Sequence, residues 1–128
     1  MIERKKTKEV RIGNVMVGGD HAVTVQSMTT TKTHDVTATL KEVERLEEAG
    51  CHLIRITVPD QPAADALKEI KKRMNVPLIA DIHFNYRMAL EAVDAGADKI
   101  RINPGNIGDK KKIKEVLDKV KGASLPIR

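Results

Sequence analysis

Apolar residues recur along the chain in two alternating patterns. Runs such as 53–58 and 78–83 are mostly aliphatic and have the length of buried strands. Between these runs, apolar residues return at helical spacing, as Val36, Leu40 and Val43 do. Strands that alternate with helices are typical of a parallel sheet with right-handed crossovers.

The pattern predicts a small hairpin over residues 10–20, with its turn at Gly13-Asn14. Strands are predicted over 22–26, 53–58 and 78–83, and the stretch 99–106 predicts a strand that runs into a glycine-containing loop. A helix is expected after each strand, since short oxygen side chains cap free amides at helix starts; the predicted caps are Asp35 (or Thr33), Asp60, Asn85 and Asp109. Pro126-Ile127-Arg128 resembles the first residues of another strand.

Two architectures fit this order, a small open doubly wound sheet and half of a TIM-type (β/α)8 barrel. An internal repeat favours the barrel. Residues 49–56 align with residues 95–102, and Arg55 and Arg101 occupy the same position in this alignment. A closed barrel needs about 250 residues. We therefore expect residues 1–128 to form a partial TIM-barrel domain, with four β/α units and the start of a fifth strand.

Composition narrows the class of protein. The net charge of +5 favours anionic partners without identifying them. Cys51 is the single cysteine, so the chain can build neither a disulfide framework nor a set of cysteine ligands for a metal cluster. The first residues are charged and no apolar run approaches the length of a membrane span. These features predict a cytoplasmic protein without membrane contact.

Polar side chains are predicted on the strand face that points away from the helices. Alternation along each strand places nine residues there, namely Gln26, Leu53, Arg55, Thr57, Ile79, Asp81, His83, Arg101 and Asn103. Of these, Gln26, Arg55, Asp81 and Arg101 are predicted near the C-terminal strand ends, where barrel enzymes keep their sites. Buried charges need a partner. The two arginines therefore predict an anion site, and the alternative is an Arg–Asp network that only stabilises the interior.

Two further features could serve such a site. The loop 103–109 contains Pro104-Gly105 and precedes a helix, so its amides could hold a phosphate, although such dipeptides also mark plain turns. His83 could act as an acid, a base or a hydrogen-bond partner of a substrate.

Three motifs in order give the chain a specific resemblance. Residues 25–29 (Val-Gln-Ser-Met-Thr), 80–84 (Ala-Asp-Ile-His-Phe) and 101–106 (Arg-Ile-Asn-Pro-Gly-Asn) together resemble the 4-hydroxy-3-methylbut-2-enyl diphosphate synthase family. The resemblance extends from about Arg11 to the last residue.

The resemblance implies a barrel that binds 2-C-methyl-D-erythritol 2,4-cyclodiphosphate in the methylerythritol phosphate route to isoprenoids. Family members are iron–sulfur oxidoreductases whose C-terminal domain holds a [4Fe-4S] cluster, with flavodoxin or ferredoxin as electron donor and a homodimer as the working unit. That domain is absent here, so we expect this chain not to ligate the cluster and to be inactive alone. The implied substrate-binding residues are Arg55, Arg101 and Arg128 for the diphosphate, with Gln26, Asp81, His83 and Asn103 at pocket positions.

Two other classes of function share some of these features. A different phosphate-binding barrel, such as a dihydropteroate-synthase-like enzyme, would share inward polar strand ends but use other motifs. A basic module that binds nucleic acid is disfavoured, because the lysines do not form one face and no aromatic stacking platform exists.

Overall fold

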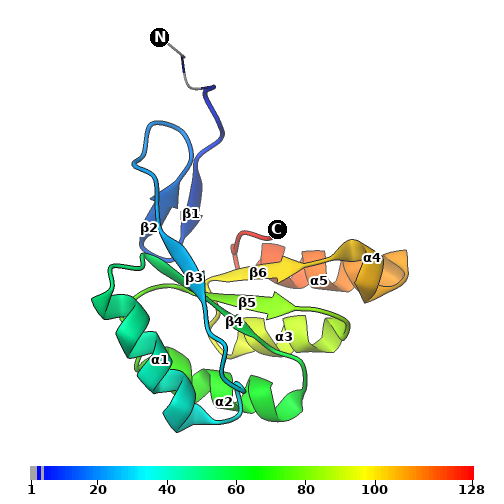
Figure 1. Ribbon diagram of the computed structural model, residues 1–128. Coiled ribbons are helices and arrows are strands. Elements are labelled where there is room, and N and C mark those ends of the chain that lie inside the picture. The colour runs from blue at the N-terminus through cyan, green and yellow to red at the C-terminus, as the bar shows by residue number, and fades with distance from the viewer. Residues whose placement is uncertain (1–2, 4) are drawn as a thin grey trace.

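Four parallel strands, paired in sequence order, form the centre of the molecule. The computed structural model describes residue 3 and residues 5–128. Its main sheet has the order β3-β4-β5-β6, with β3 at Gln26–Met28, β4 at Leu53–Thr57, β5 at Leu78–Ile82 and β6 at Lys99–Ile102. The helices α1 (Val36–Glu48), α2 (Gln61–Lys72), α3 (Tyr86–Asp94) and α5 (Lys110–Gly122) lie along one side of this sheet (Figure 1). This arrangement confirms the predicted β/α units of a TIM-type barrel.

Each helix begins at a side chain that satisfies a free backbone amide. Asp35 accepts from the amide of Ala38, and Asp60 accepts from that of Ala63. Asn85 and Asp109 cap α3 and α5 in the same way. All four predicted caps are confirmed, and Asp35 rather than Thr33 caps α1.

The main core lies between the sheet and the helices. Alternate strand residues enter it, including Ile54, Ile56, Ala80 and Ile100, all of which are fully buried. Helix residues such as Leu67 complete it from the other side. The polar strand residues must then face away from the helices, as strand alternation predicts.

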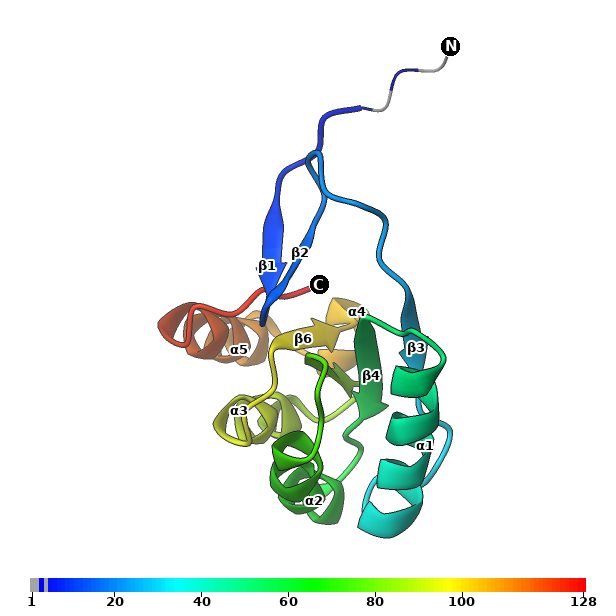
Figure 2. The same ribbon diagram turned by 90° about the vertical axis from the view of Figure 1, so that its left-hand side faces the viewer.

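The N-terminal hairpin covers part of that opposite face. Strands β1 (Val10–Ile12) and β2 (Val15–Val17) pair antiparallel around the predicted Gly13-Asn14 turn. Ile12 packs with Leu53 and Ile79 in a second, smaller apolar cluster. Figure 2 shows the hairpin on the side of the sheet away from the helices. It therefore shields the apolar lower part of the inner face from water.

The last three residues lie next to β6, where they add the beginning of one more parallel strand to the sheet. Ile127 forms an isolated parallel bridge with Ile100, and the Ile102 amide donates to the Arg128 carbonyl at 2.9 Å. The predicted start of a fifth strand is therefore present next to β6. Among the described residues, every helix is too short or too polar to span a bilayer.

Two local predictions were wrong. The first main strand was expected over residues 22–26, but β3 occupies Gln26–Met28. Val23 is 78% exposed, and ladder pairing with β4 begins only at Gln26, opposite Leu53. The loop after β6 also contains a short helix, α4 (Pro104–Ile107), because Asn103 caps it and Pro104 suits a first helical position.

Candidate functional site

The inner face of the sheet carries its polar side chains in two rows. Pairing across the strands places Arg55, Ile79 and Lys99 side by side in the lower row. Thr57, Asp81 and Arg101 form the upper row, nearer the C-terminal strand ends. The two arginines are equivalent in the sequence repeat, yet they stand one row apart because neighbouring strands are staggered. They nevertheless face the same side, as the alternation predicts.

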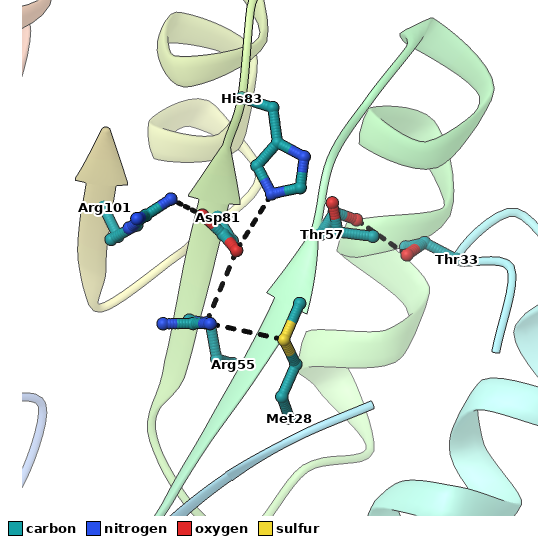
Figure 3. A network of polar contacts seen from close by, with 7 residues as sticks. All are labelled: Met28, Thr33, Arg55, Thr57, Asp81, His83 and Arg101. Atoms are coloured by element: carbon teal, nitrogen blue, oxygen red, sulfur yellow. Dashed lines mark hydrogen bonds and ion pairs between the residues drawn. The ribbon is translucent and has the colours of Figure 1, made fainter. Parts of the chain in front are cut away.

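Asp81 is the centre of this cluster. Its side chain is 2% exposed, and its Oδ1 accepts a hydrogen bond from Nη1 of Arg101 at 3.0 Å. Its Oδ2 lies 3.4 Å from Nε of Arg55 and 3.1 Å from Nε2 of His83 (Figure 3). The Arg–Asp network, which was the alternative to an anion site, is therefore present, and Asp81 contacts both arginines.

This network leaves cationic groups available for a ligand. The Arg55 and Arg101 side chains are 26% and 32% exposed. Among the described residues, Nη2 of Arg55 donates only to the weak acceptor Sδ of Met28, at 3.4 Å. Its Nε is buried without a hydrogen bond, since the contact with Asp81 has the distance of an ion pair but poor donor geometry. Arg55 can therefore offer donors to an anion.

His83 lies at the upper end of β5, with 43% of its side chain exposed. Because a carboxylate can only accept, Nε2 of His83 donates in its contact with Asp81, and Nδ1 has no part in that contact. The structure thus brings His83 to the two arginines, as predicted, and orients its ring through Asp81.

The remaining predicted residues lie at the margins of the cluster. Oδ1 of Asn103 accepts from the Gly105 amide at 3.1 Å, so this side chain shapes the loop after β6. Arg128 follows the bridge beside β6, and its charge acts on Lys99. The predicted position of Gln26 was wrong, because Gln26 begins β3, level with Leu53 and one row below Arg55. Met28 occupies the place beside Arg55 instead.

Lys99 belongs to the inner face but was missing from the predicted site. It begins β6 and stands in the row of Arg55. Burial lowers the pKa of Lys99, and the positive charges of Arg128 and Arg55 lower it further. Strand alternation already places Lys99 on the face of Arg101, so the signal was present in the sequence.

A second buried carboxylate anchors the loop at the upper rim. Oε1 of Glu42 accepts from both the amide and the hydroxyl of Thr30 at 2.9 Å, and Oε2 accepts from the Thr31 amide at 3.1 Å. Burial, the largest influence, raises the pKa of Glu42, but these hydrogen bonds together outweigh it and the net pKa is lowered. The loop between β3 and α1 is therefore fixed from α1.

The residues present do not fit an iron–sulfur cluster. Cys51 is buried in the main core, away from the inner face. In the described part of the chain, no three His, Cys, Asp or Glu side chains gather where they could hold a metal ion. The arrangement suits anion binding rather than metal coordination.

Comparison with known proteins identifies the family to which the chain belongs. Residues 7–128 match the model of the GcpE TIM-barrel domain. The chain belongs to the GcpE family. The motifs that carry its resemblance include four residues of the inner-face cluster or its margins, namely Asp81, His83, Arg101 and Asn103.

Curated relatives in the GcpE family are close in sequence. The chain is 58% identical over all 128 residues to the 4-hydroxy-3-methylbut-2-en-1-yl diphosphate synthase (flavodoxin) of Anoxybacillus flavithermus, of which it covers 35%. It is 56% identical to the proteins of the same name from Bacillus cereus and Geobacillus thermodenitrificans, over 35% and 34% of their lengths. The chain thus spans about a third of the length of the curated relatives it matches.

Solved structures of other enzymes share the fold. Dihydropteroate synthase from Xanthomonas albilineans superposes with a TM-score of 0.68 over 93% of this chain and 48% of its own, at 20% identity. The enzyme from Vibrio fischeri gives 0.69 over 94% and 48%, also at 20% identity. At this identity the likeness shows a shared β/α barrel scaffold alone, so the alternative of a dihydropteroate-synthase-like enzyme gains no functional support.

Proposed function

We propose that this chain supplies the diphosphate-binding part of an enzyme that reductively converts 2-C-methyl-D-erythritol 2,4-cyclodiphosphate to 4-hydroxy-3-methylbut-2-enyl diphosphate. The names of the curated relatives support the product and the use of flavodoxin. The observation that carries the proposal is the charge of the inner face. Arg55, Lys99 and Arg101 stand in two adjoining rows around one buried carboxylate, that of Asp81.

An excess of cations on a partly buried face is unfavourable unless an anion completes it. A diphosphate group meets this need, because guanidinium groups donate paired hydrogen bonds to phosphate oxygens. Arg55 and Arg101 would bind the two phosphates, and Arg128 would close the edge beside β6. Asp81 keeps both guanidiniums on the inner face.

The other residues of the predicted site have smaller parts in this proposal. His83 would offer its free ring nitrogen to a hydroxyl of the substrate. Asn103 would act by shaping the loop after β6. The contribution of Gln26 to substrate binding stays a prediction, since it begins β3 one row below the arginine.

The reaction consumes two electrons as the ring opens and a hydroxyl group leaves as water. The family resemblance assigns their delivery to a [4Fe-4S] cluster fed by flavodoxin or ferredoxin. Because Cys51 is buried in the core and no other cysteine exists, no electron-transfer step is assigned to these residues. We propose that the cluster ligands belong to a part of the longer proteins outside this segment.

Substrate titration tests the binding role. Calorimetry with the cyclodiphosphate should show binding to the chain, and Arg101→Ala should weaken it by about 1.5–3 kcal/mol, the range for a hydrogen bond to a charged group. Arg45→Ala removes an exposed arginine from α1 and serves as the matched control. Equal affinity of the Arg101→Ala and Arg45→Ala variants would contradict the proposed site.

A further inference from the structure

Lys99 lies on the inner face of the sheet, in the row of Arg55. It is the first residue of β6 and lies in register with Ile79, which in turn pairs with Arg55. Lys99, rather than Arg101, is therefore the β6 residue at the height of Arg55. Arg101 lies two residues further along β6, in the row of Asp81.

Arg55 and Arg128 place positive charge near Lys99, and no carboxylate of the described residues forms an ion pair with it. Asp81 is already contacted by Arg55, Arg101 and His83. Within residues 5–128, no ion pair joins Lys99 to an acidic side chain, and the side chain is partly buried. Lys99 is therefore a partly buried cation without an acidic partner in the described part of the chain.

We infer that Lys99 is a further phosphate-binding residue of the anion site. Lys99 would bind a phosphate at the lower row, and Arg101 would bind one at the upper row. This inference rests on the proposed function, because it needs an anion to enter the same face. The bound anion would supply the negative charge that Lys99 lacks in the free protein. Lys99 therefore makes the site selective for a ligand with two phosphates, one for each row.

A proton should accompany the anion. Burial, Arg128 and Arg55 lower the pKa of Lys99 in the free chain, and a bound anion favours the charged ammonium, so binding takes up a proton in the alkaline range. Affinity should then fall as the pH rises through that range. The other charged or titratable groups on this face are Arg55 of β4, Asp81 and His83 at β5, Arg101 of β6 and Arg128 beside it.

The test measures cyclodiphosphate affinity as a function of pH in three forms of the chain. Each phosphorus atom of this ligand carries one ester and one anhydride linkage and keeps a single strongly acidic hydroxyl, so the charge of the ligand is constant above neutral pH. We expect Lys99→Met to bind about tenfold or more weakly near pH 8 and to lose the alkaline pH dependence. Lys99→Arg, whose charge does not titrate, should keep the affinity and lose the pH dependence.

Two controls separate the possible outcomes. Lys114→Met, on the exposed face of α5, should leave both affinity and pH profile unchanged. Urea unfolding of Lys99→Met should show equal or greater stability than the parent chain, because a partly buried cation among cations is removed. A loss of stability would identify Lys99 as structural and overturn the inference.

Failure of this inference is distinct from failure of the proposed function. If the parent chain binds the cyclodiphosphate and Lys99→Met binds it equally well with the same pH profile, the role of Lys99 is wrong and the arginine site stands. If the parent chain does not bind the ligand at all, the anion site and the role of Lys99 are both wrong.

Discussion

Nη1 of Arg101 donates to Oδ1 of the buried Asp81 at 3.0 Å, across the pairing of β6 with β5. This bond joins two residues that alternation alone places on the same face. It holds the guanidinium against the sheet while nearly a third of the arginine side chain stays exposed. The pair therefore presents a fixed cation to the open side of the half-barrel.

Replacing Asp81 by asparagine should cost both stability and binding. The change leaves Arg55 and Arg101 partly buried without a counter-charge, which we expect to lower the free energy of unfolding by about 2–3 kcal/mol. The expected loss is at or below the cost of breaking a fully buried ion pair, because water partly solvates both arginines. Urea unfolding measures it. Asp118→Asn, at an exposed position on α5, is the control and should change little.

Glu42→Gln should loosen the rim loop in a pH-dependent manner. The carboxylate accepts three hydrogen bonds from Thr30 and Thr31, so we expect a loss of about 2 kcal/mol at pH 7. Since the pKa of Glu42 is lowered in the fold, its stabilisation is full above about pH 4.5 and disappears as the pH falls through the lowered value. The difference between parent and variant in urea unfolding should therefore shrink in acid. Glu44→Gln, an exposed neighbour, should show no such difference at any pH.

The hairpin should contribute to stability through Ile12. This side chain is 1% exposed and packs on Leu53 and Ile79, so Ile12→Ala should create a cavity costing about 2–4 kcal/mol. Thermal or urea unfolding measures the loss. Val23→Ala, at a position that is 78% exposed, should be nearly neutral. An equally small effect at both positions would mean that the hairpin does not pack on the sheet in solution.

Much of the fold could be predicted because its local signals agree with one another. The four Asx caps, the aliphatic strands and the hairpin turn each act within a few residues. Strand alternation also sufficed to place Arg55, Asp81 and Arg101 on one face. These features depend on neighbours in sequence, which pattern analysis can read.

The errors concern the relation between strands. The start of β3 is set by its pairing with β4, so Val23 and Val25 looked like strand residues although both are exposed. The stagger of the strands puts Lys99, not Arg101, in the row of Arg55, with Ile79 between them. Alternation gives the face of each strand residue, but register between strands depends on three-dimensional packing, so neither the place of Gln26 nor the row of Lys99 followed from the sequence.

The chain should self-associate through the edge at β3. The hairpin covers Leu53 and Ile79, but Val23 and Val25 are 78% and 53% exposed next to β3, whose outer edge pairs with no strand of the described residues. We expect a homodimer at micromolar concentration, measurable by light scattering. The double variant Val23→Lys with Val25→Lys should be monomeric, whereas Leu117→Lys on α5 should keep the dimer. A monomeric parent chain would contradict this expectation.

A crystal structure of the chain with bound 2-C-methyl-D-erythritol 2,4-cyclodiphosphate tests the central claim most directly. The claim is that the inner face of the half-barrel is a diphosphate site built around Asp81. The predicted result is phosphate density on the inner face, with oxygens in hydrogen-bond contact with the guanidiniums of Arg55 and Arg101 and the Asp81 bonds intact. Ligand density at another surface, with both arginines contacting only protein and water, would contradict the account.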